Sequence, residues 1–232
     1  MRGPADNPGE EHVGSGTFEQ KGGRRLAQGV LVAAVLLYAA VRIGFLCFSL
    51  QMASAASLRQ AVDQYSGLLM AMDESLVLSA VLGGWAFYNA CRSRVRSGRA
   101  LTGLAVASFA LMLIAWVVIV LGTGRLVYPV NGLPVIADDG LQAAVVEIYG
   151  AWYLCDIMLG VLMIAWAGSS CRPLWKHSGA AIGLAQILST YFGQPVKPVP
   201  MLIAIALSTA WMLMRGVSSI NGLESEAVQE AE

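Results

Sequence analysis

The residues of greatest chemical interest in this sequence are polar side chains set within long apolar segments. A carboxylate can take up and release a proton, a guanidinium can hold an anion, and an amide or a phenol can orient either group by hydrogen bonding. Ionisable residues inside membrane-spanning segments often mark substrate or proton pathways. The side chains concerned are Arg42, Asn89, Glu147, Tyr153, Asp156 and Gln186.

Asp156 lies at the centre of an apolar segment, residues 144–168. About 25 residues that each rise about 1.5 Å make a helix long enough to cross a hydrocarbon core of about 30 Å. A charge at the centre of such a helix costs at least about 2.5–3.5 kcal/mol, so it should face other helices, water or a partner instead of lipid. The segment therefore predicts a bundle of several membrane helices.

The composition also indicates a membrane protein. Hydrophobic residues make up 56% of the chain and charged residues 13%, and the mean hydropathy is +0.62. Soluble domains contain about 25% charged residues. The formal net charge is zero, so no general attraction to nucleic acid is expected.

Six apolar segments predict an all-α, polytopic membrane helix bundle with about six transmembrane helices. The fifth segment is the shortest, spanning only about 22 Å as a helix. It is either a short tilted helix or half of a re-entrant hairpin with the sixth. The segments are residues 26–50, 75–91, 100–122, 144–168, 179–193 and 201–217.

The ends of the chain differ from this bundle, which covers residues 26–217. Residues 1–25 are rich in Gly, Pro and charge and show no apolar periodicity, which predicts a disordered tail. Residues 218–232 predict an acidic tail. Both tails are expected in the cytoplasm.

The distribution of Lys and Arg predicts the orientation. With the N-terminus inside, the outer loops hold three basic residues, Arg59, Arg125 and Lys197. Cytoplasmic loops of membrane proteins carry an excess of Lys and Arg, so a multi-pass protein of the cell (inner) membrane with both termini cytoplasmic is expected. The inner segments hold eleven, namely Arg2, Lys21, Arg24, Arg25, Arg92, Arg94, Arg96, Arg99, Arg172, Lys176 and Arg215.

Arg42 and Asp156 are the predicted buried partners. In the six-helix topology their depths differ by only a few ångströms, at about 1.5 Å per residue. An ion pair between them would remove two desolvation penalties. Glu147 is a rival partner nearer the outer interface, to which Arg42 could snorkel.

Two interpretations of the polar residues remain open. In the first, Arg42, Tyr153, Asp156 and Gln186 form an intramembrane polar site for a substrate or proton. In the second, Arg42 and Asp156 fix the pairing of the first and fourth helices, and Tyr153 and Gln186 are satisfied by their neighbours.

The outer loops are the longest connections. In residues 51–74, the helical spacing of Leu58, Val62, Tyr65 and Leu69 predicts an amphipathic interfacial helix. In residues 123–143, the turn signals include Asp139-Gly140. The acids of these loops predict a solvated surface in preference to a cation site.

Catalytic, cofactor and metal-binding motifs are absent from the sequence. It contains no HExxH, GxSxG, Walker or dinucleotide-binding pattern, and no CxxC. We therefore expect no enzymatic activity, no cofactor and no metal.

Tryptophans near the segment ends are interpreted as interface anchors. Glycines 83, 84, 103, 160 and 183 are interpreted as sites of close helix packing.

The stretch RPLWKHSGAAIGLAQIL, from Arg172 to Leu188, resembles a pattern found in small uncharacterised bacterial membrane proteins of about six helices. In these proteins a short basic loop with Pro and Trp leads into a glycine-spaced helix. The resemblance covers one hairpin and implies a class of protein, without site residues.

Together these observations predict a non-enzymatic integral membrane protein with a structural or regulatory role exercised through partners. The alternative is a small transporter or channel that uses the Arg42 and Asp156 region. The expected partners are the lipid bilayer and a membrane protein or a second copy of the chain, and no nucleic acid.

Overall fold

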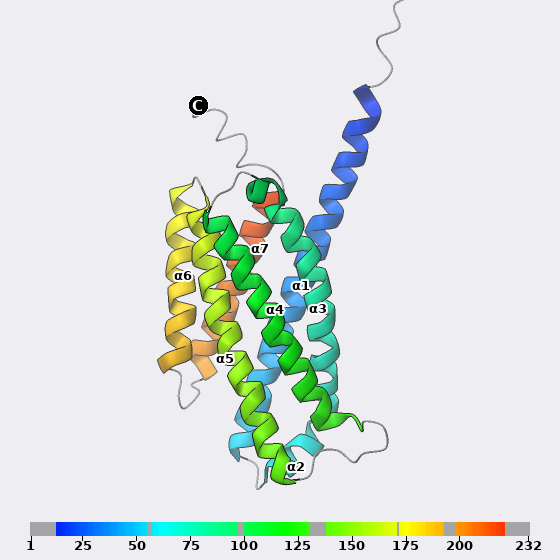
Figure 1. Ribbon diagram of the computed structural model, residues 1–232, viewed down its shortest axis with the longest axis vertical. Coiled ribbons are helices and arrows are strands. Elements are labelled where there is room, and N and C mark those ends of the chain that lie inside the picture. Colours follow the sequence, from blue (N-terminus) through cyan, green and yellow to red (C-terminus); the bar gives the residue numbers. More distant parts are fainter. Residues whose placement is uncertain are drawn as a thin grey trace, which may run out of the picture.

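The computed structural model describes residues 13–54, 57–96, 100–129, 138–170, 172–192 and 198–220, and the regular elements in these ranges are all helices (Figure 1). The predicted all-α membrane bundle is therefore confirmed. The helices are α1 (Val13–Ser54), α2 (Leu58–Gln64), α3 (Ser66–Arg96), α4 (Ala100–Val127), α5 (Asp138–Gly168), α6 (Pro173–Phe192) and α7 (Pro198–Ile220).

The long helices run side by side and alternate in direction, so the start of α1 and the end of α7 lie at the same end of the bundle (Figure 1). The short helix α2 lies at the opposite end. Over the described residues, the backbone of α1 packs mainly against α3 and α7, whereas that of α5 packs against α4 and α6. Helices α1 and α5 are therefore joined chiefly by side chains.

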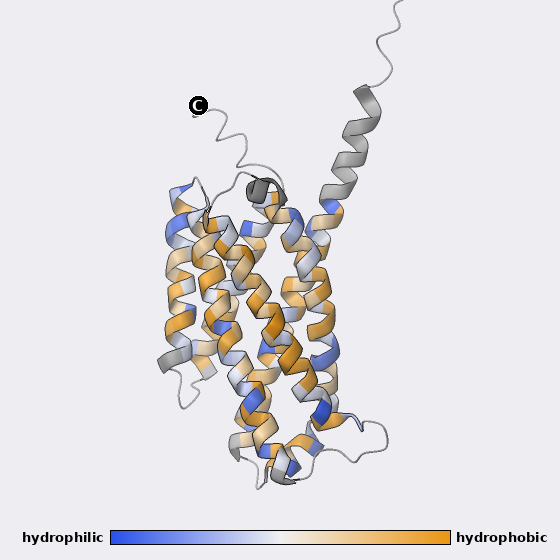
Figure 2. Cartoon of the chain, in the orientation of Figure 1, coloured by the Kyte–Doolittle hydropathy of each residue, from blue (hydrophilic) through white to orange (hydrophobic). Residues whose placement is uncertain are grey.

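Five helices are long and apolar enough to cross a membrane, namely α1, α3, α4, α5 and α7. Hydrophobic residues cover their middle parts, and hydrophilic residues gather toward the ends (Figure 2). Both observations support a multi-pass membrane protein.

Helix α6 is not among the five candidate spans, so its crossing remains a prediction. Its buried residues recur once per turn and are small or polar, and include Gly179, Gly183, Gln186 and Thr190. Small residues at an interface allow membrane helices to approach closely. The same residues lower the hydropathy of α6, which explains why it is not among the candidate spans.

Helix α1 begins before the first apolar segment. It starts at Val13, within the region that composition predicted to be a disordered tail. The disorder of residues 1–25 stays a prediction. The predicted acidic tail lies outside the described residues, apart from the last turn of α7, which ends at Ile220.

The connection between α1 and α3 contains the predicted amphipathic helix, but this helix breaks at Tyr65. Ser57 caps the start of α2 by accepting a hydrogen bond from the amide of Gln60 at 3.1 Å. Val62 on α2 and Leu69 on α3 are both buried.

The turn predicted at Asp139-Gly140 is wrong, because α5 begins at Asp138. Aspartates in a first turn favour a helix, since their charge complements the helix dipole.

Two of the five glycines bring helices into close contact. A Cβ atom added to Gly160 on α5 would lie 2.6 Å from the carbonyl oxygen of Gly183 on α6, and one added to Gly183 would lie 2.6 Å from that of Gly160. The packing role predicted for Gly160 and Gly183 is therefore present. Gly84 and Gly103 have no heavy atom within 4 Å of such a Cβ, so their predicted packing role is wrong.

Most of the described tryptophans lie in the core instead of at the membrane interface. The rings of Trp166, near the end of α5, and Trp211, in the middle part of α7, meet edge to face with centroids 6.0 Å apart. The interpretation of tryptophans near segment ends as interface anchors is therefore wrong for Trp166. Trp116, Trp152, Trp166 and Trp211 are all at most 5% exposed.

Candidate functional site

The predicted ion pair is present at the centre of the bundle. The guanidinium Nη2 of Arg42 on α1 contacts the carboxylate Oδ1 of Asp156 on α5. The side chain of Arg42 is 2% exposed and that of Asp156 is 9% exposed. The pair therefore lies in a closed core, where each charge compensates the other.

The pair belongs to a longer antiparallel seam between α1 and α5. The hydroxyl of Tyr149 donates a hydrogen bond to Ser49 Oγ at 2.7 Å. One turn deeper, the ring of Phe45 lies 5.0 Å from that of Trp152, and the next turn holds Arg42 and Asp156. The contacting residues on each helix are three or four positions apart, which is the spacing that keeps a seam on one face of a helix.

Gln186 adds a third helix to the pair. Its amide Nε2 donates a hydrogen bond to Asp156 Oδ1 at 3.1 Å, and the residue is 1% exposed. The same carboxylate oxygen therefore accepts from α6 and contacts the guanidinium from α1. Gln186 lies three residues beyond Gly183, so the close approach of α5 and α6 brings this amide within reach of Asp156.

Tyr153 and Glu147 take other positions. Tyr153 is half-buried and lies one helical turn before Asp156, beside the buried cluster. Glu147 is exposed, and Asp156 is the acid that contacts Arg42. The structure therefore brings together Arg42, Asp156 and Gln186, and the rival pairing of Arg42 with Glu147 is wrong.

Tyr38 is a member of the site that sequence reasoning missed. It lies one turn before Arg42 on α1, and the guanidinium carbon of Arg42 lies 5.9 Å from the centre of its ring. The indole of Trp116 on α4 lies 4.9 Å from the same ring, so it packs against the tyrosine that covers the cation. Arginine over an aromatic ring gains electrostatic attraction, which is stronger away from water. The spacing of Tyr38 and Arg42, four residues apart, was the available signal.

The hydrogen-bonding capacity of the cluster is not fully used. Nε and Nη1 of Arg42 and Oε1 of Gln186 are buried without a hydrogen-bond partner among the described residues. Buried polar atoms left in this state cost free energy, so they are positions where a water molecule or a small polar ligand would be favoured.

A second arginine is buried nearer the end of the bundle where α1 starts. Arg215 on α7 is 0% exposed, and its guanidinium carbon lies 5.8 Å from the centre of the Trp166 ring. The count of basic residues in the inner segments includes Arg215, but the structure places its side chain in the core. Its place in the last turns of α7 made the sequence ambiguous, because a long basic side chain near a helix end can reach either the interface or the core.

Glu74, two turns into α3, pairs with a tyrosine that follows α4. Tyr128 donates a hydrogen bond to Glu74 Oε1 at 3.4 Å. Among the described residues, no group of three or more His, Cys, Asp and Glu side chains is arranged to hold a metal ion.

The three residues brought together from α1, α5 and α6 thus form a compact buried cluster of one cation, one anion and one amide. Comparisons of the chain with protein-family models, with curated proteins and with solved structures found no match.

Proposed function

We propose that this protein is a non-enzymatic, multi-pass protein of the bacterial cell (inner) membrane that has a structural or regulatory role and acts through partners. The observation that carries the proposal is the closed contact of Arg42 with Asp156 in the middle of the bundle. Both charges are used to join helices that otherwise have few backbone contacts.

The burial of the pair supports this role over a transport role. A transport site must reach water from one side of the membrane, whereas these two side chains are 2% and 9% exposed. Charges in a membrane interior are stable when they compensate each other. Gln186 binds the same carboxylate, so the cluster ties α1, α5 and α6 together.

One observation favours the alternative, a small transporter or channel. Arg42 and Gln186 retain buried hydrogen-bonding atoms without partners among the described residues. A substrate or a chain of water molecules in an open state would satisfy these atoms.

The orientation and partners of the protein follow from its charges and surface. The excess of basic residues in the inner segments supports cytoplasmic termini. The exposed apolar side chains of the long helices suit a lipid bilayer and a membrane partner, either another protein or a second copy of the chain. Nucleic acid is not a proposed partner, because the formal net charge is zero.

A double-mutant cycle on the full chain tests the proposal. Asp156→Leu should lower the free energy of unfolding by about 3–5 kcal/mol, because it leaves Arg42 buried without its counter-ion. Adding Arg42→Met should recover much of this loss. Glu147→Gln is the control, since this acid is exposed on the same helix and its removal should change stability by less than about 0.5 kcal/mol.

Proton flux into liposomes separates the two functions. If the pair is structural, vesicles that contain the wild-type protein and a pH-sensitive dye should equilibrate an imposed pH gradient no faster than empty vesicles. Additive losses in the mutant cycle, together with proton flux that disappears in Asp156→Asn, would contradict the structural role and support the transporter.

A further inference from the structure

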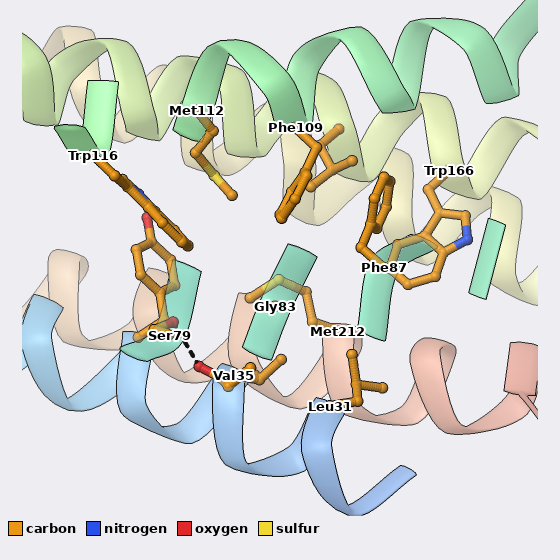
Figure 3. A pocket seen from close by; sticks show the side chains of 13 residues that line it. Leu31, Val35, Ser79, Gly83, Phe87, Phe109, Met112, Trp116, Trp166 and Met212 are labelled. Carbon is orange, nitrogen blue, oxygen red and sulfur yellow. Dashed lines mark hydrogen bonds between the residues drawn. The ribbon is translucent and has the colours of Figure 1, made fainter. Parts of the chain in front are cut away.

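A cavity of about 50 Å³ lies among the helices of the bundle (Figure 3), and neither Arg42 nor Asp156 lines it. Helices α1, α3, α4, α5 and α7 all contribute to its wall. The Tyr38 ring, near Arg42, and the Trp166 ring, near Arg215, are part of this wall.

The wall exposes carbon and sulfur atoms. Ser79 uses its hydroxyl to donate a hydrogen bond to the carbonyl of Ala34 at 3.0 Å, as the dashed line in Figure 3 shows. The hydroxyl of Tyr38 and the indole nitrogens of Trp116 and Trp166 are buried without a hydrogen-bond partner among the described residues, but the surface that the wall presents to the cavity is almost entirely apolar. A water molecule requires two to four polar partners, and apolar cavities stay dry for this reason. The cavity therefore suits an apolar occupant.

Rigid rings and adaptable side chains share the wall. Phe87 and Phe109 stack with their centroids 4.5 Å apart, and Phe87 meets Trp166 edge to face at 5.6 Å. Met112 and Met212 point into the same space from α4 and α7 (Figure 3). Methionine is unbranched and fills irregular gaps, so these two residues can move to admit a group somewhat larger than the cavity.

Gly83 leaves this space open on the α3 side. A Cβ atom added there would lie 3.8 Å from the Cβ of Ala34 and 3.9 Å from the Phe109 ring, which are ordinary contact distances. The absence of a side chain at position 83 is thus not required by a close helix approach, and any larger residue would extend into the cavity.

From these observations we propose that the central cavity is a binding site for a compact, uncharged hydrocarbon group. Apolar cavities in protein cores take up benzene or xenon, at volumes of about 150 Å³ in an engineered case, and a smaller cavity selects a smaller group. Two sources supply this chemistry in a membrane, a free apolar molecule and the end of a lipid acyl chain. The proposal does not depend on the role of the Arg42 and Asp156 pair.

The test uses quenching of tryptophan fluorescence by heavy atoms, because Trp116 and Trp166 line the cavity. The full chain is placed in lipid nanodiscs. In one arm, xenon is added to nanodiscs of ordinary lipid. In the other arm, the lipid chains carry bromine at their ends and no xenon is present. Gly83→Leu fills the cavity, and Gly84→Leu is the matched control because position 84 faces open space on the same helix.

The wild-type protein and Gly84→Leu should show a saturable xenon-quenching component, which Gly83→Leu should lose. Excess quenching by brominated chains in the same two proteins would identify an acyl chain as the source, and quenching by xenon alone would identify a free molecule. Gly83→Ala, whose Cβ fits at ordinary contact distance, should reduce the saturable xenon quenching. This variant replaces Gly83→Leu in the test if Gly83→Leu does not fold. The proposal would be overturned if the wild-type protein showed neither saturable xenon quenching nor excess quenching by brominated chains. It would also be overturned if such quenching persisted in Gly83→Leu.

Discussion

The crossing of α5 and α6 at Gly160 and Gly183 gives a sharp test of the packing. In Gly160→Ala the new methyl group would lie 2.6 Å from the carbonyl oxygen of Gly183 and 2.5 Å from Cγ1 of Ile187. A carbon and an oxygen in favourable contact are about 3.3 Å or more apart, so α6 must move away by about 0.7 Å. The isoleucine can change its rotamer, but the carbonyl belongs to the backbone and cannot.

The same movement affects the polar cluster, because Gln186 lies on α6 and Asp156 on α5. Their hydrogen bond of 3.1 Å would lengthen to about 3.8 Å, which is beyond hydrogen-bonding range. Overpacking costs about 1–3 kcal/mol, loss of the hydrogen bond costs about 1 kcal/mol, and replacing glycine within a helix returns up to about 1 kcal/mol. We therefore expect Gly160→Ala to lower the free energy of unfolding by about 1–3 kcal/mol.

Equilibrium unfolding of the purified protein in mixed detergent micelles, followed by circular dichroism, measures this loss. Gly150→Ala is the control, because its Cβ would meet no heavy atom within 4 Å on the same helix. The control should be as stable as the wild-type protein or more so. Equal stability of Gly160→Ala and Gly150→Ala would refute the close approach of the two helices.

Three further predictions follow from other parts of the structure. Gly83→Ala should raise the free energy of unfolding by about 1 kcal/mol, more than Gly84→Ala does, because its methyl group also gains contacts with the wall of the cavity; the same micelle assay measures both. Tyr149→Phe should lower stability by about 1 kcal/mol through loss of the hydrogen bond to Ser49, and combining it with Ser49→Ala should cost less than the sum of the two changes. A cysteine introduced by Gly132→Cys should react with a membrane-impermeant thiol reagent on intact cells if the orientation proposed from the basic residues is right; labelling only after permeabilisation would reverse the topology.

The bundle and its central ion pair were predictable because exposing an apolar segment to water, or leaving a charge unpaired in the membrane, costs a large free energy. An apolar segment must find lipid or other helices, and a charge at mid-membrane must find its counter-ion, so depth favoured Asp156 as the partner of Arg42, with Glu147 as the rival. Gln186 was found for a similar reason, since an amide within an apolar segment needs a partner.

Other features could not be predicted because the free energy that favours one position of the side chain over another is small, or depends on how the helices pack. Arg215 lies close enough to a helix end for either a loop or the core to accept it. The glycines at 84 and 160 have the same composition signal, and only the crossing of α5 with α6 distinguishes them. Tyr38 lies four residues before Arg42, a spacing that allows the two side chains to meet, but the spacing alone does not show that the ring covers a buried cation.

Neighbouring aromatic rings run through the bundle as one uninterrupted row, with successive centroids 4.5–6.4 Å apart. In spectroscopic terms, such a row makes the packing of the helices visible in the near-ultraviolet. Near-ultraviolet circular dichroism disappears when side-chain packing is lost, even where the helices persist. A rotation of one helix against its neighbours would therefore alter this spectrum while the far-ultraviolet signal of the helices stayed constant. The row is formed by Tyr38, Trp116, Phe109, Phe87, Trp166, Trp211 and Trp175.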